Sequence, residues 1–403
     1  MARPLASSHP ARIPPRPPPL LKLHETFTNG GYFWRDDYLL ERWARSEQPV
    51  VYLGDVYHGY ELKLRLGHWC WLTRDPASGE FLTIKFLSLP SGPIHDGLPG
   101  MNELPISPFV KQHCQSPFVS TIKTNFRIPH HLSKIEATYK HVAYDAIVYP
   151  VTGTDLRRLS THAWAFLENP NKVPLPPGRR KETIRDLTLG LAALHEIGIA
   201  HGDIHPGNVT LAPPSAHEIE RYLATRPPAV DEVRRKDGAP TDPTLPCRVT
   251  EHVDIGFGHG HASIIDLGYA FHTIDGRSYS RDYFPQGTPL PPELLGNSDA
   301  TTNLPFKVDS WQLGLCMFFI LTHGKFFIYR WLRTAEEDWL NQHRQEYAEL
   351  SDAGSELCEK IPADLREGFR PILLSLLCPD PARRASVKDI ARHQWLIQGD
   401  GRQ

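Results

Sequence analysis

An acid, an amide and two histidines are gathered in the segment HGDIHPGN, residues 201–208, which is too rich in glycine and proline to be helix or strand. Asp203 and Asn208 are five residues apart. That spacing suits phosphoryl transfer, in which an aspartate accepts the proton of the attacking hydroxyl and an asparagine holds a metal ion on nucleotide phosphates. In IIDLG, residues 264–268, Asp266 follows an apolar run and precedes a glycine, so it can present a second metal-binding carboxylate from a strand end.

A lysine and a glutamate nearer the start of the chain complete the candidate set. Lys85 falls in the third of three strand-like runs, YELKL, WCWL and FLTIKFL, which predict a small antiparallel sheet. A lone lysine on such a strand is more often solvated surface, but beside the downstream acids it can pair with nucleotide α- and β-phosphates. Glu103 is the candidate ion-pair partner, although we expect Pro105 to cut its helix short.

Further elements are needed to position these residues. Two more strands are expected near residues 118–128 and 141–149, and the flexible composition of residues 150–156 suggests a hinge. Apolar residues recur at helical spacing from 179 to 197, and Gly198 is expected to end this helix just before HGDIHPGN.

The order of these motifs resembles that of the protein kinases over residues 53–396. HGDIHPGN is similar to the family's catalytic loop, and Asp266 to the aspartate of its DFG motif, written DLG here. The resemblance implies an α+β, two-lobed protein-kinase fold, with a small antiparallel-sheet N-lobe at 53–149 and a mostly helical C-lobe at 150–398. It also implies ATP and Mg²⁺ as cofactors, with Asn208 and Asp266 as metal ligands.

The resemblance gives each candidate residue a role. The implied catalytic residues are Asp203, Lys85 and His205. The residues implied to bind the nucleotide and its metal are Lys85, Glu103, Gly67, Asn208 and Asp266.

Three later residues are expected to be structural. Glu293 closes GTPLPPE, which is similar to the kinase APE motif, and the resemblance implies an ion pair with Arg384. Asp309 begins DSWQLG, similar to a kinase helix whose aspartate hydrogen-bonds to the catalytic-loop backbone. A helix N-cap is the simpler interpretation of Asp309.

Within the kinases, the lead-in GDVYHGYEL, the long insert and the ending PPELL resemble the fungal branch of the SR-protein kinases, which implies a serine/threonine kinase and an Arg/Ser-rich protein substrate. Gly202 stands where most kinases carry an arginine that binds a phosphorylated activation loop. We therefore expect activity to be independent of such phosphorylation. Eight acids at 334–360, against Arg344 and Lys360, either form a docking groove for that substrate or are a solvated helical face.

Two departures from the kinase pattern predict weak activity. The phosphate-covering loop should read GxGxxG, but LGHWCWL at 66–72 keeps only Gly67 and leaves few backbone N–H groups for phosphates. His205 replaces a lysine and is cationic only part of the time near neutral pH. A pseudokinase scaffold that binds partners or nucleotide without catalysis is therefore the main alternative. HGDIHPGN is also similar to small-molecule phosphotransferases, but these lack the PPE ending and the DSWQLG helix.

Composition narrows the remaining function classes. The 403 residues carry a formal net charge of -2, which argues against general nucleic-acid binding. The six cysteines are far apart, without metal-binding spacing, and predict free thiols in a reducing compartment. The apolar run at 313–321 is about half of the ~20 residues of a membrane span, so it predicts a buried helix. We expect a cytoplasmic and/or nuclear monomer, with no direct nucleic-acid or membrane partner.

Three segments differ from the rest in composition. Residues 1–25 are rich in proline and predict a disordered tail, whereas the aromatic-rich residues 26–52 predict an ordered extension. Residues 211–261 are polar, charged and rich in proline, which predicts a surface insert. Within it, GFGHGH at 256–261 mimics a glycine-rich nucleotide loop, but no helix pattern follows, so a mobile loop is favoured.

Overall fold

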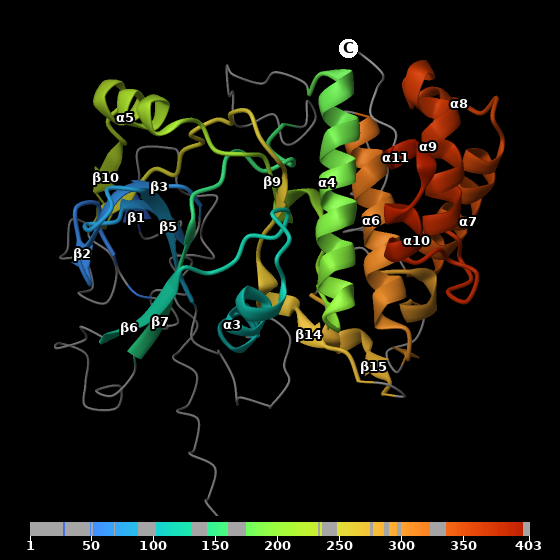
Figure 1. The fold of residues 1–403 in the computed structure, drawn as a ribbon, viewed down its shortest axis with the longest axis horizontal. Helices are drawn as coiled ribbons and strands as arrows, with labels where there is room; N and C mark the ends of the chain where they lie inside the picture. Colours follow the sequence, from blue (N-terminus) through green and yellow to red (C-terminus); the bar gives the residue numbers. More distant parts are fainter. Residues whose placement is uncertain are drawn as a thin grey trace, which may run out of the picture.

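The computed structural model describes residues 27–28, 49, 51–67, 69–87, 102–129, 143–159, 175–232, 234–235, 248–274, 277–285, 290–295, 300–322 and 336–397. The predicted tail at 1–25, most of the extension at 26–52 and His68 lie outside these residues. Figure 1 shows a β-sheet on one side of the molecule and a group of helices on the other. We call these two parts the sheet lobe and the helical lobe.

The sheet lobe is built on six antiparallel strands in the order β2-β3-β4-β5-β7-β6. They are β2 (Val56–Tyr57), β3 (Tyr60–Arg65), β4 (Cys70–Arg74), β5 (Phe81–Phe86), β6 (Thr124–Pro129) and β7 (Ala143–Pro150). The turn between β4 and β5 is closed by the Gly79 N–H, which donates to the Asp75 carbonyl at 2.8 Å. The three predicted sheet strands and the strand near 141–149 are thus present.

The strand predicted at 118–128 is only partly correct, because β6 begins at Thr124. Residues 118–120 bond instead to β13 (Ser263–Ile264). The Ile264 N–H donates to the Phe118 carbonyl at 2.8 Å, and the Ser120 N–H donates to the Ile264 carbonyl at 2.9 Å. This stretch therefore connects the sheet lobe to the strand that leads to Asp266.

The sheet separates an apolar face from the face that carries Lys85. Leu82, Ile84 and Phe86 of β5 lie in one buried cluster with Trp71 of β4. Lys85 stands between two of these residues, and side chains alternate along a strand, so it points to the opposite face.

Helix α3 (Glu103–His113) packs beside the sheet and corrects the expectation about Pro105. Pro105 lies in the first turn, where the backbone N–H groups have no partner within the helix, so its missing N–H costs nothing there. Pro108 lies inside the helix and does remove one helical hydrogen bond. The Asn102 N–H donates to the Gly268 carbonyl at 3.1 Å, which fixes the start of α3 beside the turn after Asp266.

The helical lobe is centred on α6 (Pro305–Leu321), whose second half is the predicted buried helix. Trp311 and Phe318 are fully buried in it. Figure 1 shows α6 beside α4, with the last helices of the chain on its far side. The other helices of this lobe are α4 (Pro177–Glu196), α7 (Glu336–Ser351), α8 (Glu356–Glu359), α9 (Ala363–Leu376), α10 (Val387–Ala391) and α11 (Gln394–Ile397). Within the described ranges, no helix combines the length and apolar character needed to cross a membrane.

The predicted surface insert at 211–261 is not a detached loop where the structure describes it. Its helix α5 (Ala216–Thr225) begins with a capping box formed by Ser215 and Glu218. Short strands follow: β10 (Val230–Glu232) pairs with β12 (Arg248–Thr250), and β11 (Arg234–Arg235) pairs with β1 (Phe27–Thr28). A buried cluster joins insert and sheet lobe, and its members are Leu64, Leu72, Phe81, Ile219 and Ile255.

The insert also bonds to the hinge. The Val253 N–H donates to the Arg65 carbonyl at 2.8 Å, which continues the edge of β3. The Thr154 hydroxyl donates to the Asp254 carboxylate at 2.7 Å, and the Thr154 N–H donates to the Gly256 carbonyl at 3.0 Å. The glycine-rich stretch at 256–261 is therefore part of a hydrogen-bonded structure that connects the hinge to the sheet.

The segment after Asp266 is closed by the ion pair that the sequence predicts. Both guanidinium nitrogens of Arg384 contact Glu293, at 2.7 and 2.8 Å, and the Arg384 side chain is fully buried. The elements in this segment are β14 (Phe271–His272), β15 (Tyr279–Ser280), η4 (Arg281–Tyr283), η5 (Pro292–Leu294) and β16 (Thr301–Thr302). The cysteines within the described ranges are free thiols, and Cys247 lies outside those ranges.

Candidate active site

The loop HGDIHPGN is fixed by hydrogen bonds with two side chains of α6. The Asp309 carboxylate accepts hydrogen bonds from the backbone N–H groups of His201 and Gly202, both at 2.8 Å. Gln312, one turn later, accepts from the Ile204 N–H at 2.9 Å and donates to the Gly202 carbonyl. The predicted bond between Asp309 and the loop backbone is confirmed. The N-cap interpretation is wrong, because α6 begins four residues earlier.

Asp203 and Asn208 lie together in this loop, and both are largely buried. The Asn208 amide nitrogen donates to the Asp203 carbonyl at 3.0 Å and to its carboxylate at 3.2 Å. Pro206 opens the short 3₁₀ turn η2 (Pro206–Asn208), which brings the two side chains face to face. Because the nitrogen of Asn208 is used on Asp203, its amide oxygen remains as the donor atom for a metal.

His205 lies near the same oxygen of the Asp203 carboxylate. Its Nδ1 accepts from the Gly207 N–H at 2.9 Å, so in the neutral imidazole the proton is on Nε2. That Nε2 lies 3.6 Å from Asp203 Oδ2. His205 therefore presents a hydrogen to the carboxylate whether or not the ring is charged.

Asp266 is brought to the same place by pairing between short strands. β9 (Val209–Thr210) pairs with β13, and the Ile265 N–H donates to the Asn208 carbonyl at 3.0 Å. His201 Nε2 donates to the Ile265 carbonyl while its Nδ1 accepts from the Asp203 N–H. The residues before Asp203 and before Asp266 are thereby fixed to each other.

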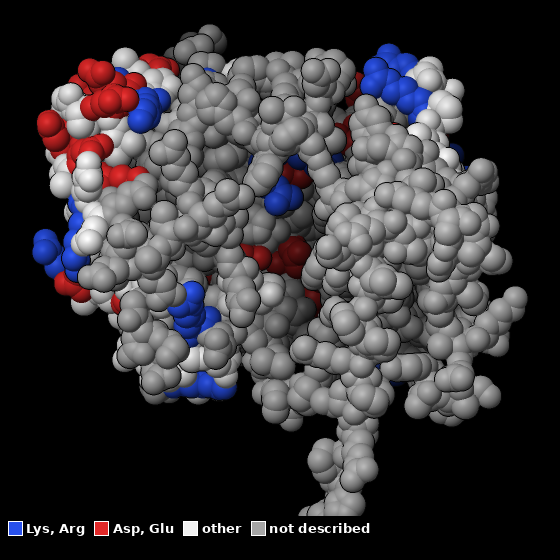
Figure 2. Space-filling view, turned by 180° about the vertical axis from the view of Figure 1, so that it is seen from behind, with Lys and Arg blue, Asp and Glu red and all other residues white. Residues whose placement is uncertain are grey.

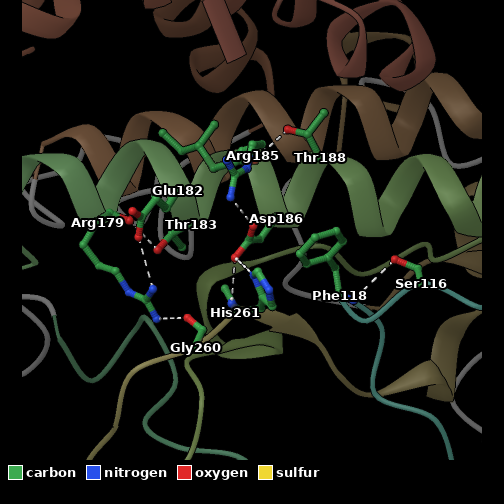
Figure 3. A network of polar contacts seen from close by, with 12 residues as sticks. Ser116, Phe118, Arg179, Glu182, Thr183, Arg185, Asp186, Thr188, Gly260 and His261 are labelled. Carbon is green, nitrogen blue, oxygen red and sulfur yellow. Dashed lines mark hydrogen bonds and ion pairs between the residues drawn. The ribbon is translucent and has the colours of Figure 1, made fainter. Parts of the chain in front are cut away.

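The entry to β13 is anchored on α4 by a buried carboxylate, that of Asp186 (Figure 3). The Ala262 N–H donates to Asp186 Oδ2 at 3.0 Å, and His261 Nδ1 lies 3.3 Å from the same oxygen. Arg179 of the same helix bonds to the Gly260 carbonyl. The sequence analysis missed Asp186, whose only signal was an acid on the apolar side of a helix.

Asp266 has a left-handed backbone, with φ of 66°, and its carboxylate accepts from the Gly268 N–H at 3.1 Å as the turn η3 (Leu267–Tyr269) begins. Lys85 Nζ lies 2.8 Å from the same carboxylate oxygen. Burial raises the pKa of Asp266, but the charge of Lys85 and these hydrogen bonds outweigh it and hold the pKa below its usual range. Asp266 therefore remains an anion suited to a hard metal ion such as Mg²⁺.

Lys85 also forms the ion pair with Glu103 that the sequence analysis proposed, at 2.6 Å. Burial lowers the pKa of Lys85, but the two carboxylates raise it well above its usual value, so the lysine is charged. Burial raises the pKa of Glu103 more than Lys85 lowers it. Tyr149 of β7 donates to the other carboxylate oxygen of Glu103 at 2.8 Å, a contact that no local sequence pattern indicated.

Gly67 lies in the tight turn between β3 and β4. Its backbone N–H does not point toward Lys85 and Asp266. The Leu66 and Gly67 N–H groups both donate to the Cys70 carbonyl, at 2.8 and 3.2 Å. Arg158, just after the hinge, donates to the Leu66 carbonyl at 3.0 Å. The N–H groups of Leu66 and Gly67 are therefore used within the protein.

Gly202 occupies a position that a side chain cannot enter. Its φ of 75° is left-handed, and an added Cβ would lie 2.9 Å from the Tyr269 carbonyl. The rings of Phe271 and Phe284 are next nearest, and both belong to a buried aromatic and aliphatic cluster beneath the segment after Asp266. Aromatic side chains thus fill the region into which a side chain at residue 202 would extend.

Figure 2 shows the molecule from behind, where its surface is hollowed near the middle and both acidic and basic side chains lie in the hollow. Among the described residues, no group of three or more His, Cys, Asp or Glu side chains could hold a metal ion. Asn208 and Asp266 offer one amide and one carboxylate oxygen, so a metal here would need further oxygens from phosphates or water.

Comparisons with known proteins agree with this geometry. A sequence model of the protein kinase domain matches residues 138–396. The chain is 22% identical over 240 residues to the serine/threonine-protein kinase GRIK2 of Arabidopsis thaliana, covering 56% of this chain and 42% of that protein. It is 26% identical over 249 residues to the putative cyclin-dependent kinase F-2 of Oryza sativa subsp. japonica, covering 56% of this chain and 60% of that protein. The chain therefore spans less than two thirds of the length of these relatives.

Among solved structures, the chain is similar to the crystal structure of the yeast RNA Pol II CTD kinase CTDK-1 complex. The TM-score is 0.53 at 16% sequence identity, with 87% of this chain and 96% of that chain covered. At this identity the likeness bears on the fold alone.

We predict that Gly202→Ala destabilises the protein more than Gly198→Ala. Both glycines have left-handed φ, 75° and 76°, so each substitution should cost about 1–2 kcal/mol of backbone strain. Only at residue 202 does the new Cβ also collide with a carbonyl, whereas at residue 198 its nearest neighbour is the Thr273 hydroxyl at 4.0 Å. Thermal denaturation of both variants measures the difference. Equal losses of stability would contradict the close contact.

Proposed function

Because the chain belongs to the protein kinase family, we propose that it is an ATP-dependent serine/threonine kinase that transfers the γ-phosphoryl group of ATP to a protein hydroxyl. The observation that carries the proposal is the convergence of Asp203, Asn208 and Asp266 with a lysine already paired to a glutamate. A scaffold without catalysis would not need this combination of groups. The structural contacts at Asp309 and Glu293 favour a protein kinase over a small-molecule phosphotransferase.

In this proposal each residue has one task. Asp203 accepts the proton of the substrate hydroxyl. At the same time the hydroxyl oxygen bonds to the γ-phosphorus, and the bond between that phosphorus and ADP breaks. Lys85, oriented by Glu103, binds the α- and β-phosphates. Asn208 and Asp266 would hold Mg²⁺, which neutralises phosphate charge. His205 places a hydrogen beside the Asp203 carboxylate and keeps it oriented.

We expect the turnover to be low. The N–H groups of Leu66 and Gly67 are used on Cys70, so they would have to break those bonds to reach a phosphate. A hydrogen bond to a charged group contributes about 1.5–3 kcal/mol, and losing one corresponds to about a ten- to hundredfold loss of affinity. This feature favours the pseudokinase alternative. Thermal shift with ATP and Mg²⁺, followed by a transfer assay, would distinguish a pseudokinase from an active kinase.

The central test compares Asp203→Asn with Asp266→Asn. The first should abolish phosphoryl transfer while Mg²⁺-dependent ATP binding remains, because it removes the base and little volume. The second should lose the Mg²⁺ dependence of ATP binding, because it removes the anionic metal ligand. Isothermal titration with ATP, with and without Mg²⁺, measures binding, and a transfer assay measures the reaction. Transfer at the parent rate by Asp203→Asn would reject the assignment of the base.

A separate prediction concerns regulation. Treatment of the active protein with a phosphatase should leave its rate nearly unchanged. Gly202 offers no cation to a phosphate, and the aromatic cluster under the segment after Asp266 holds that segment without one. The control is the same assay on enzyme mock-treated with inactivated phosphatase. A loss of activity of tenfold or more on dephosphorylation would contradict this account.

The resemblance to the SR-protein kinases leads us to propose an Arg/Ser-rich protein substrate. Asp352, Glu356 and Glu359 are exposed on and before α8 and could attract such a cationic segment. An Arg/Ser-rich peptide should then bind with an affinity that falls steeply between 0.05 and 0.5 M salt, roughly the range over which the Debye length shortens severalfold. Glu356→Gln with Glu359→Gln should weaken binding, whereas Glu80→Gln on the sheet should not. Equal affinity for a neutral serine peptide would remove the idea.

A further inference from the structure

We propose that Tyr149 is a positioning residue: its hydroxyl joins β7 to two residues of α3 one turn apart and thereby holds Glu103 on Lys85. The catalytic consequence rests on the proposed function. The contact itself does not, so the two can be tested separately.

The register of the sheet places Tyr149 on the same face as Lys85. In β5, Thr83 and Lys85 are two residues apart and share a face. Thr83 lies opposite Tyr149 in β7, and Lys85 lies opposite Ile147. Because directly opposite residues point to the same side of an antiparallel pair, the tyrosine ring extends beside the lysine toward α3.

The hydrogen bonds around the tyrosine have only one consistent arrangement. Its hydroxyl donates to Glu103 Oε1 at 2.8 Å, while Glu103 Oε2 lies 2.6 Å from Lys85 Nζ. The Ser107 hydroxyl lies 3.2 Å from the same tyrosine oxygen. The single proton of the tyrosine is used on the carboxylate, so Ser107 must be the donor in this second bond. One hydroxyl thus contacts residues i and i+4 of the helix, which lie on the same side.

The hydrogen bonds of Tyr149 support a helix that is weakened by an internal proline. It is eleven residues long and contains Pro108, so it lacks one of its own hydrogen bonds. Its Ile106 and Val110 pack in the main hydrophobic core. Its hydrogen bonds to other segments include two at its ends: the Asn102 N–H donates to the Gly268 carbonyl, and Lys111 donates to the Lys123 carbonyl. Neither acts on the Glu103 side chain. Besides Lys85 itself, Tyr149 is therefore the contact that holds the Glu103 carboxylate, and it lies within this chain.

The variant Tyr149→Phe removes the hydroxyl and keeps the ring. We expect kcat/KM for ATP to fall about tenfold or more, because a hydrogen bond to a charged carboxylate is lost. The acid limb of its pH profile should move to higher pH. Burial already raises the pKa of Glu103, and the tyrosine hydrogen bond lowers it. Without that bond, Glu103 is protonated at higher pH and releases Lys85.

The other groups that face Glu103 do not obscure this shift. Asp266, from the turn after β13, keeps its pKa below the usual range and stays ionised as the pH falls. Cys70, from β4, has its thiol pKa raised by burial to about 11 and stays neutral. Lys85 remains charged throughout. Among these groups Glu103 is therefore the one that is protonated as the pH falls, and Tyr149→Phe changes the contribution of Glu103 to the acid limb and not that of the base Asp203.

Tyr57→Phe is the matched control. Tyr57 lies on β2 of the same sheet, and its hydroxyl also contacts a carboxylate, that of Asp55, at 3.1 Å. It should leave the acid limb and kcat/KM unchanged. In a Glu103→Gln background the limb due to Glu103 is absent, so adding Tyr149→Phe should give no further shift.

A second measurement keeps the proposal testable if the parent protein transfers no phosphate. Hydrogen exchange of the α3 amides and the ¹³C titration of the Glu103 carboxyl need no activity. Tyr149→Phe should speed exchange in α3 and raise the pKa of Glu103, and Tyr57→Phe should do neither. Absence of transfer by the parent together with these changes rejects the proposed function alone. Unchanged exchange and an unchanged Glu103 titration would overturn the role of Tyr149.

Discussion

The structure depends on one buried carboxylate, that of Asp309, which receives two backbone N–H groups of the catalytic loop. It is inaccessible to solvent, and a carboxylate in such a place is strongly disfavoured unless its oxygens are hydrogen-bonded. His195 Nε2, at 2.8 Å, provides a further contact from α4. The loop and the two central helices therefore fix one another. Asp203 and Asn208 owe their placement to this arrangement, since a short segment rich in glycine and proline would not hold one conformation by itself.

A second charge cluster connects the lobes. The Lys85 ammonium lies between two carboxylates, one at the start of α3 and the other on the turn after β13. Within this cluster the positions of the sheet, the helix and the turn are linked, because the single cation of Lys85 is paired with both carboxylates. Removing Lys85 would leave two carboxylates facing each other without a cation. The contrast in protonation follows: Asp266 is held ionised, whereas Glu103 is the more easily protonated of the pair. As the pH falls, the carboxyl of Glu103 on α3 is therefore protonated before that of Asp266.

The sequence predicted those features that depend on short spacings. Asp203 with Asn208 and the helix ended by Gly198 follow from local patterns. The pairing of Glu293 with Arg384 spans 91 residues and was predicted from the resemblance to the kinases instead. What it missed depends on contacts between distant segments. Residues 118–120 read as a sheet strand but pair with β13, and the carboxylate of Asp186 serves a strand about 75 residues later. The role of Tyr149 requires the register between β5 and β7, which no periodicity within either strand can supply.

The docking of the insert on the sheet affects how the chain matures. The strands of the sheet lobe are complete once β7 has been made, yet Leu64, Leu72 and Phe81 share their buried cluster with Ile219 and Ile255, which come later in the chain. Ile219 and Ile255 lie 69 and 105 residues after the end of β7. At about 5–20 residues translated per second, they appear roughly 3 to 20 seconds later. During that interval the nascent sheet exposes an apolar patch. The arrival of α5 then covers this patch.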